Sequence, residues 1–158
     1  MTESDPLVRD ILNAFTIVDC DLKRPWGRFY CIDSAEIERF IDRFFPRYQR
    51  LKTSPAPLSP KILVVNAGQK LSWQYHNRRK EVWLVVQGPV GVVRSADDQE
   101  RPISIEETGA IVELERTERH RLVGLLSAGV VAEIWIHTDS NHPSDEDDIV
   151  RLQDSYGR

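Results

Sequence analysis

The sequence predicts an all-β fold, either an antiparallel sandwich or a jelly roll, and three observations lead to it. From Lys61 onward, short runs rich in Val, Ile, Leu and Trp are separated by turn signals at 67–68, 88–89, 97–98 and 108–109. Between these runs no segment is long enough for the helix that a parallel crossover needs. The chain has 158 residues, about the length of one domain. A single barrel or sandwich is therefore expected.

Two short helices are expected before the strands. Residues 5–16 carry apolar side chains at helical spacing, with a proline in the first turn, where a helix tolerates it. In the second segment, 34–45, Ser34 is the expected N-cap, the apolar residues form one stripe, and Pro46 ends the helix. The apolar faces of both helices must be buried against another surface.

A proline-rich connector follows, and it sets the expected domain organisation. Prolines at 46, 55, 57 and 60 argue against regular structure over 46–60. This connector is too short to separate two domains. We therefore expect the N-terminal helices and connector, 1–60, to pack on a barrel and C-terminal tail formed by 61–158.

The strands are placed by their apolar runs, and a short helix is expected at the end of the chain. The predicted strands are 61–66, 70–76, 81–87, 90–94, 101–105, 110–115, 119–124 and 129–137. After a polar loop at 138–147, the segment 148–154 is predicted to form the last helix.

Composition and charge exclude several classes of function. A formal net charge of −4, with basic residues scattered among acidic ones, offers no face for nucleic acid. No apolar run reaches the roughly 18 residues of a membrane helix, and the N-terminus lacks the pattern of a signal peptide. Cys20 and Cys31 are too few and too far apart for a disulfide scaffold or a Cys-x-x-Cys site. We expect a cytoplasmic protein with free thiols, and no membrane or nucleic-acid partner.

The segment 68–88 carries the chemistry. Alternation along its first strand turns Ser72, Gln74 and His76 to one face. Polar groups inside a barrel need a partner. Here the groups are an amide oxygen, an imidazole and the Glu81 carboxylate of the next strand, and a metal ion would satisfy all three. Each residue alone has an ordinary explanation, as a hydrogen-bonded histidine, a polar amide or a surface carboxylate. The residues predicted to share a metal are Gln74, His76, Glu81 and His120.

The spacing of these residues resembles the first cupin motif. That motif is Gly, five residues, His-x-His, four residues, Glu, six residues, Gly, with Gln74 in place of the first histidine. The second motif resembles its cupin counterpart less closely. Gly109 and His120 are correctly spaced, but Glu115 and Thr117 stand where Pro and Gly are usual.

Longer segments are similar to the cupin domain of type II mannose-6-phosphate isomerases. In that family the domain often follows a nucleotidyltransferase, and we expect it to stand alone here. The similar segments are RPWGRFY at 24–30, LSWQYHNRRKEVWLVVQGPVGV at 71–92, RHRLVG at 119–124, AEIW at 132–135 and EDDIVRLQDSYGR at 146–158. This resemblance implies a cupin jelly-roll barrel with short added N-terminal and C-terminal helices. It also implies a divalent metal and the isomerisation of a sugar phosphate, with mannose 6-phosphate and fructose 6-phosphate as the first expectation. Zinc suits the nitrogen and oxygen ligands, as do manganese, iron, cobalt and nickel.

A proton shuttle is expected on the last long strand. Alternation places Glu133, Trp135 and His137 on one face, and a carboxylate inside a barrel tends towards the raised pKa of a general base. Glu133 is the predicted base. The alternative is a salt bridge between Glu133 and a neighbouring arginine.

Basic side chains near the motif are candidates for binding the substrate. Arg79 shares a face with Glu81 and would hold the enediolate or the phosphate, unless it is a solvated turn residue. Arg78, Arg121 and Lys61 are further phosphate candidates, although Arg121 alternates away from His120.

Two other features have simpler explanations. The four tryptophans are expected to pack in the core rather than to form a sugar-stacking platform; they are Trp26, Trp73, Trp83 and Trp135. The acidic run 145–148 is expected to supply charge at the start of the last helix, with a calcium site as the alternative.

We consider three functions and expect a homodimer. The first function is the isomerase, acting on mannose 6-phosphate, a phosphoheptose or another sugar phosphate. A sugar-binding or regulatory cupin without turnover and an iron-dependent oxygenase are the alternatives. The apolar stripe of 34–45 and the outward Trp73 and Tyr75 favour a homodimer. The alternative is that these elements pack on one another within one chain.

Overall fold

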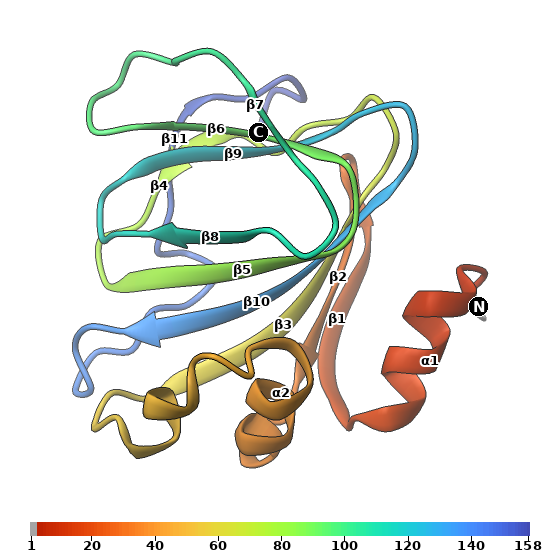
Figure 1. Ribbon diagram of the computed structural model, residues 1–158. Helices are drawn as coiled ribbons and strands as arrows, with labels where there is room; N and C mark the ends of the chain where they lie inside the picture. The colour runs from red at the N-terminus through yellow and green to blue at the C-terminus, as the bar shows by residue number, and fades with distance from the viewer. Residues whose placement is uncertain (1–2) are drawn as a thin grey trace.

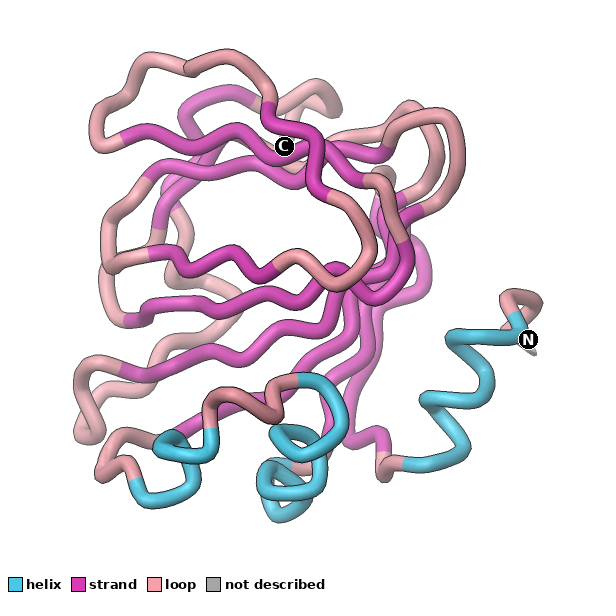
Figure 2. Tube along the Cα trace, in the orientation of Figure 1, coloured by secondary structure: helices cyan, strands magenta, loops and turns pink. Residues whose placement is uncertain are grey.

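A computed structural model describes residues 3–158, and it confirms the cupin jelly-roll barrel. Two antiparallel sheets curve around one interior, and the two α-helices lie outside the larger sheet (Figure 1). Figure 2 shows the same separation, with the strands gathered in the barrel and the helices along one side of it.

The elements follow the chain in this order: α1 (Pro6–Ala14), β1 (Ile17–Arg24), β2 (Gly27–Ile32), the 3-10 turn η1 (Ser34–Glu36), α2 (Ile37–Phe44), the 3-10 turn η2 (Gln49–Thr53), β3 (Leu58–Val65), β4 (Trp73–Tyr75), β5 (Arg79–Gln87), β6 (Val90–Ser95), β7 (Ser104–Glu106), β8 (Ile111–Leu114), β9 (Arg119–Gly124), β10 (Gly129–His137) and β11 (Val150–Gln153).

The larger sheet separates two apolar layers. Its strand order is β1-β2-β3-β10-β5-β8, and the smaller sheet has the order β11-β4-β9-β6-β7. Side chains between the sheets, among them Val85, Leu122 and Val131, form the interior layer. Alternate residues such as Val82 and Ile134 face outward and pack beneath the helices. Both faces of β5 and β10 are therefore buried, as their nearly continuous apolar runs require.

The two helices form where the sequence predicts them, with one correction. In α1, the Asp5 carboxylate accepts hydrogen bonds from the backbone nitrogens of Leu7 and Val8 at 2.9 and 3.2 Å. Ser34 is not the cap of the second helical segment, because the Asp33 carboxylate accepts from the Ala35 nitrogen at 3.0 Å. A preceding Asp already serves as the acceptor, so Ser34 becomes the first residue of the turn.

The expected boundary at residue 60 needs correction. β1 and β2, which the sequence analysis missed, belong to the larger sheet, and β2 pairs with β3 from Gly27–Val65 to Cys31–Lys61. β3 itself starts at Leu58, and η2 interrupts the proline-rich connector. None of the residues of β1 is fully buried, so its sequence carries no alternating apolar pattern that would predict a strand.

Most of the predicted strands are confirmed, but the C-terminal helix is wrong. β9 and β10 have their predicted bounds. In place of the helix over 148–154, β11 pairs with β4, with Val150 opposite Tyr75 and Arg151 opposite Gln74. β4 would otherwise be an open edge, and pairing satisfies backbone groups that a short isolated helix would leave exposed.

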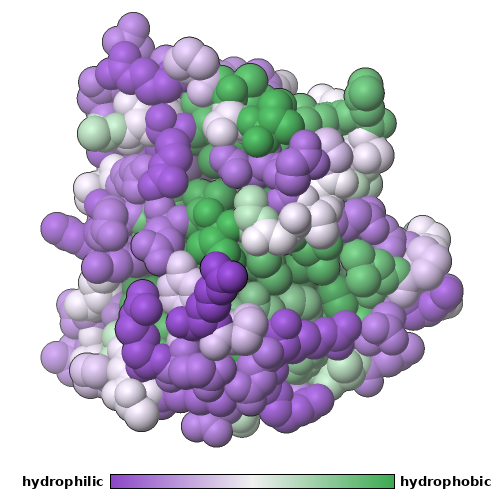
Figure 3. All heavy atoms as spheres, in the orientation of Figure 1, coloured by the Kyte–Doolittle hydropathy of each residue, from purple (hydrophilic) through white to green (hydrophobic). Residues whose placement is uncertain are grey.

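The apolar faces that favoured a homodimer are covered within the chain. The stripe of α2 packs with α1 on the outer face of the larger sheet, and Trp73 is buried. The homodimer therefore stays a prediction without this support. Figure 3 shows apolar atoms near the top of one face, and Ile103 and Ile105, beside and on β7, are 46% and 52% exposed. No helix in residues 3–158 combines the length and apolar composition needed to cross a bilayer.

Candidate metal centre

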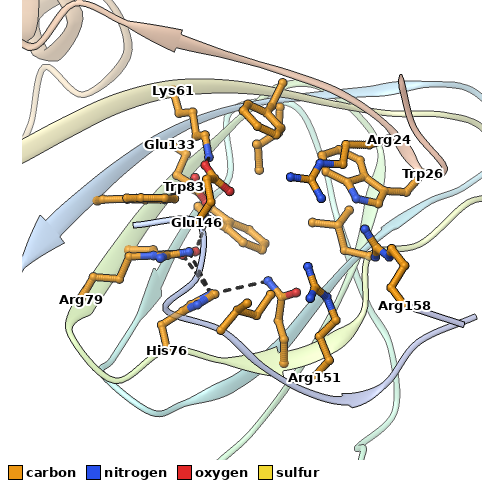
Figure 4. A pocket seen from close by; sticks show the side chains of 17 residues that line it. Arg24, Trp26, Lys61, His76, Arg79, Trp83, Glu133, Glu146, Arg151 and Arg158 are labelled. Carbon is orange, nitrogen blue, oxygen red and sulfur yellow. Dashed lines mark hydrogen bonds and ion pairs between the residues drawn. The ribbon is translucent and has the colours of Figure 1, made fainter. Parts of the chain in front are cut away.

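One end of the barrel interior is polar and hollow. The cavity has a free volume of about 70 Å³, room for several water molecules. Figure 4 shows Lys61, Arg79 and Glu133 on one side of it, with Arg24, Arg151 and Arg158 on the other. Five basic side chains and three carboxylates line it.

Strand register brings the predicted site residues together. Gln74 of β4 lies opposite His120 of β9. On the other sheet, Trp83 of β5 lies opposite Glu133 of β10, and Glu133 lies opposite Lys61 of β3. Residues that are distant in the sequence thus share one interior surface, and alternation along each strand turns their side chains inward.

The two predicted histidine ligands expose the same ring nitrogen. His76 Nδ1 lies 2.7 Å from the carbonyl oxygen of Asp148, and His120 Nδ1 lies 2.9 Å from that of Glu118. Carbonyl oxygens only accept, so both Nδ1 atoms carry the hydrogen and both Nε2 atoms are left with a lone pair. These Nε2 atoms lie 3.3 and 3.6 Å from the Glu81 carboxylate.

This arrangement fits a cation. The ligand atoms of His76, Glu81 and His120 lie within 4.8 Å of one another, and His120 Nε2 is buried without a hydrogen-bond partner. Burial lowers the pKa of His76 to about 3, so its imidazole is neutral near pH 7. Two lone pairs and a carboxylate facing each other are costly to bury unless a positive charge joins them.

Gln74 lies beside this triad. Its amide nitrogen is 3.5 Å from His76 Nε2, and its oxygen accepts from the Ser72 hydroxyl at 2.5 Å. The assignment of amide oxygen and nitrogen follows the hydrogen bonds, and a flip of the amide would turn its oxygen towards the histidines. Gln74 thus remains a proposed fourth ligand.

The Arg79 guanidinium makes its hydrogen bonds to other residues of the chain. Its Nε donates to Glu81 at 2.8 Å, its Nη1 to Ser144 at 2.8 Å, and its Nη2 lies 3.1 Å from His76 Nε2. The guanidinium also stacks on Trp135 at 3.6 Å. Burial would raise the pKa of Glu81, but the charge of Arg79, together with the two histidines and a hydrogen bond with Glu133, lowers it. These contacts make Arg79 a positioning residue, with most of its donors engaged by protein groups.

Glu133 points into the cavity, as alternation predicts. Two indoles hold its carboxylate: Trp83 Nε1 donates at 2.7 Å and Trp135 Nε1 at 2.6 Å. Trp83 Nε1 also reaches Glu81 at 3.0 Å, so the two carboxylates are neighbours. Burial and the negative charge of Glu81 raise the pKa of Glu133 to about 8. Indole donors, rather than the arginine of the alternative explanation, orient this group.

The other predicted residues are divided between the cavity and its surroundings. Lys61 lines the cavity, contacts Glu146 and lies 4.2 Å above the Trp135 ring. Arg78 and Arg121 lie outside it: Arg78 is 3.5 Å from Asp145, and Arg121 bonds to Glu100 at 2.8 Å. For Arg121 the reason is the strand alternation that turns it away from His120.

The tryptophans divide between two roles. Trp26, Trp83 and Trp135 line the cavity, so the core-packing expectation is incomplete for them. Trp73 is buried on the opposite face of β4, where its Nε1 donates to the Asp98 carbonyl at 2.8 Å.

Three arginines at the mouth of the cavity were not predicted from the sequence. Arg24 comes from β1, Arg151 from β11 and Arg158 from the last residue, and all three line the cavity. The segment of Arg151 was predicted to be a helix and that of Arg24 was given no element, so strand alternation could not indicate where these side chains point. The only signal was their presence in the segments that resemble the isomerase family.

The acidic run 145–148 begins no helix, which corrects its expected role. Instead, the Asp148 carboxylate accepts from the backbone nitrogens of Asn77 and Arg78, both at 3.0 Å, and from Ser144 Oγ at 2.6 Å. Its carbonyl oxygen accepts from His76. Burial alone would raise the pKa of Asp148, but hydrogen bonds from Ser144 and the backbone lower this pKa. This residue therefore ties the C-terminal segment to the β4–β5 hairpin.

We expect Asp148→Ala to lower the free energy of unfolding by about 2 kcal/mol, because three donors lose their acceptor. Urea unfolding measures it, and Asp147→Ala, which removes an exposed carboxylate of the same run, is the control. Because the pKa of Asp148 is lowered in the folded protein, the effect should be complete near neutrality. It should shrink as the pH falls below about 4. Equal stability of both variants would contradict the role of Asp148.

The turn before His120 is present although the second cupin motif departs from the usual sequence. Thr117 adopts φ 65°, in the left-handed region where glycine is favoured, and its nitrogen donates to the His76 carbonyl at 2.9 Å. The turn is thus retained despite the substitution, and it delivers His120 to the cavity.

The fold and the triad define a cupin-type barrel with a candidate metal centre. The sequence matches the family "Mannose-6-phosphate isomerase C-terminal" over residues 36–154, and the chain belongs to this family.

Curated relatives are similar along most of this chain. The "Xanthan biosynthesis protein XanB" of Xanthomonas campestris pv. campestris is 31% identical over 135 residues, covering 85% of this chain. The "Mannose-1-phosphate guanylyltransferase ManC" of Salmonella typhimurium is 30% identical over 138 residues, covering 87%. The chain spans only 23% of the length of either relative. Neither name says isomerase, so the resemblance is confirmed for the domain family and not for the type II isomerases in particular.

Solved structures support the fold. The capsular polysaccharide assembling protein CapF of Staphylococcus aureus superposes with a TM-score of 0.56 at 16% identity, covering 83% of this chain and 33% of that one. Vicilin from Corylus avellana has the same TM-score at 13% identity, covering 84% of this chain and 33% of that one. At such identity the likeness concerns the fold alone.

Proposed function

We propose that this chain is a metal-dependent sugar-phosphate isomerase, with mannose 6-phosphate and fructose 6-phosphate as the aldose and ketose. A phosphoheptose or another hexose phosphate would use the same chemistry. The observation that carries the proposal is the meeting of two Nε2 lone pairs, the Glu81 carboxylate and Glu133 in one cavity. Membership of the family named for mannose-6-phosphate isomerase supports it.

His76, Glu81 and His120, with Gln74 beside them, would hold the metal. Zinc is the proposed ion, and manganese, iron, cobalt and nickel suit the same ligands. When bound, a divalent ion stabilises negative charge on a substrate oxygen. The triad leaves coordination positions open, as a catalytic rather than a structural site requires.

Glu133 is proposed as the general base. In this role its carboxylate removes the C2 proton of the aldose, the C2–H electron pair forms the C1–C2 double bond, and the carbonyl pair moves onto O1. The proton then returns to C1 as the hydroxyl proton of O2 passes to O1, which leaves a carbonyl at C2. Trp83 and Trp135 hold the carboxylate by both oxygens, so its position is set before substrate binds. His137 is a weaker candidate, because Ser59 and the Ser144 nitrogen engage both of its ring nitrogens.

The test is to measure bound metal and then to follow exchange of the C2 proton with solvent for a panel of sugar phosphates. We expect metal-dependent exchange with at least one aldose phosphate and no oxygen uptake. Metal-loaded protein that exchanges no proton with any member of the panel would exclude the isomerase. Oxygen uptake would favour the oxygenase.

Arg79→Lys is expected to lower kcat by about tenfold or more, with a smaller change in KM. An ammonium cannot reach Glu81, His76 and Ser144 together as the planar guanidinium does, so the triad loses its alignment. The matched control is Arg78→Lys, since Arg78 acts on Asp145 and Asp148 only as a charge at 3.5 and 3.8 Å. Unchanged kinetics in the Arg79 variant would contradict the positioning role.

One observation favours a second function, a sugar-binding or regulatory cupin without turnover. The Arg79 guanidinium already places a positive charge against Glu81 and His76, which could neutralise the site without a metal. A protein of this kind would bind the sugar phosphate but would contain no stoichiometric metal and would exchange no C2 proton.

A further inference from the structure

Three arginines at the mouth of the cavity come from segments far apart in the sequence. Arg24 lies at the end of β1, Arg151 on the edge strand β11 and Arg158 at the end of the chain. All three line the same cavity as His76 and Glu81 of the triad, and Figure 4 shows them on the side opposite Arg79 and Glu133. We will call Arg24, Arg151 and Arg158 the mouth arginines.

Local structure positions each of them. Arg24 belongs to the tight β1–β2 hairpin, where it pairs with Gly27, and a Cβ at Gly27 would lie 2.0 Å from the Val64 carbonyl oxygen. Arg151 is carried by β11, opposite Gln74. Arg158 is held by Asp154, which accepts from its Nε at 2.8 Å and from its backbone nitrogen at 3.1 Å.

The mouth arginines are incompletely neutralised. Arg158 pairs with Asp154, and Arg24 Nε lies 3.0 Å from the Asp21 carboxylate in an ion pair that lacks hydrogen-bond geometry. Within residues 3–158, no ion pair forms at Arg151, whose side chain is exposed at the mouth. Gathering three guanidinium groups costs electrostatic free energy, which an anion placed among them would recover.

Within residues 3–158, the other basic side chains of the cavity already contact protein groups and are less available to such an anion. Arg79 uses its donors on Glu81, Ser144 and His76, and Lys61 contacts Glu146. Arg78 and Arg121, the other sequence-based candidates, lie outside the cavity. A ligand with its sugar at Glu133 and the triad would extend its far end towards the mouth arginines.

We propose that the mouth arginines form a subsite for a phosphate monoester, which orients the substrate with its sugar towards Glu133. This rests on the proposed function for the identity of the sugar phosphate. The planar guanidinium fork matches phosphate oxygens in pairs, and three forks from separate segments surround a dianion better than a monoanion. The subsite therefore discriminates a sugar phosphate from the free sugar.

The experiment is calorimetric titration of the full chain with mannose 6-phosphate, with mannose and with inorganic phosphate. We expect mannose 6-phosphate to bind at least about tenfold more tightly than mannose, and inorganic phosphate to compete with it. Arg151→Gln should weaken mannose 6-phosphate at least about tenfold and leave mannose unchanged, since a charge-assisted hydrogen bond contributes about this much. Arg158→Gln should act in the same direction.

Arg101→Gln is the matched control, because Arg101 is an exposed arginine that pairs with Asp97 away from the cavity. If Arg151→Gln and Arg158→Gln bind mannose 6-phosphate as tightly as Arg101→Gln does, the subsite is excluded. Binding is measured apart from turnover, so the two proposals fail separately. Phosphate-dependent binding without C2 exchange would leave the subsite standing and exclude the isomerase. If the protein exchanges the C2 proton but both variants bind mannose 6-phosphate as tightly as the unmutated protein does, the isomerase is supported and the subsite is excluded.

Discussion

Glu133→Gln is expected to lose C2 proton exchange by about a hundredfold or more, the usual scale for a positioned general base. An amide cannot take up the proton, although it has nearly the same size and remains beside Trp83 and Trp135. The measurement is the rate of solvent deuterium incorporation at C2, using the sugar phosphate that exchanges fastest with the unmutated protein.

Two further variants make the result specific. Glu133→Asp keeps a carboxylate but withdraws it by one methylene, so we expect a loss of exchange with the fold and the metal retained. The control Glu107→Gln removes an exposed carboxylate outside the cavity and should exchange like the unmutated protein. Exchange near the unmutated rate in Glu133→Gln, at equal metal content, would place the base elsewhere.

His76→Ala and His120→Ala should each lower bound metal at least about tenfold, because even changes outside the ligand shell reduce metal affinity on this scale. Each substitution removes one Nε2 lone pair from the triad and leaves Glu81 with a single imidazole. Metal is measured by elemental analysis after dialysis against a defined concentration of free zinc.

His142→Ala is the matched control, since His142 is an exposed histidine of the loop after β10. It should retain full metal content and show that histidine loss alone has no effect. Full occupancy in both triad variants would contradict the ligand set. An unmutated protein that binds no divalent metal would also contradict it, and would favour the binding module in which Arg79 neutralises Glu81.

Local sequence patterns were enough to predict the barrel strands that bury a regular apolar pattern. β9 and β10 have their predicted bounds because each strand ends at a turn, and β10 in addition carries a nearly continuous buried apolar run. The same patterns missed β1 and β2 and assigned a helix to β11. β1 and β11 lie at sheet edges, and β11 is stabilised by β4, which is distant in the sequence.

For the site, strand alternation was enough to predict which side chains point inward, because alternation is a property of the extended backbone. Gln74, His76 and Glu133 were predicted in this way, and the motif spacing added Glu81 and His120.

How these groups are held, and what surrounds them, depends on contacts that the strand patterns do not report. The Asp148 carbonyl selects the ring nitrogen that His76 presents, and two indoles orient Glu133. Arg24 and Arg151 reach the mouth of the cavity from opposite ends of the chain. The physical reason is that a strand pattern reports only which face a side chain occupies. Hydrogen-bond partners and neighbouring charges depend on segments that folding brings together.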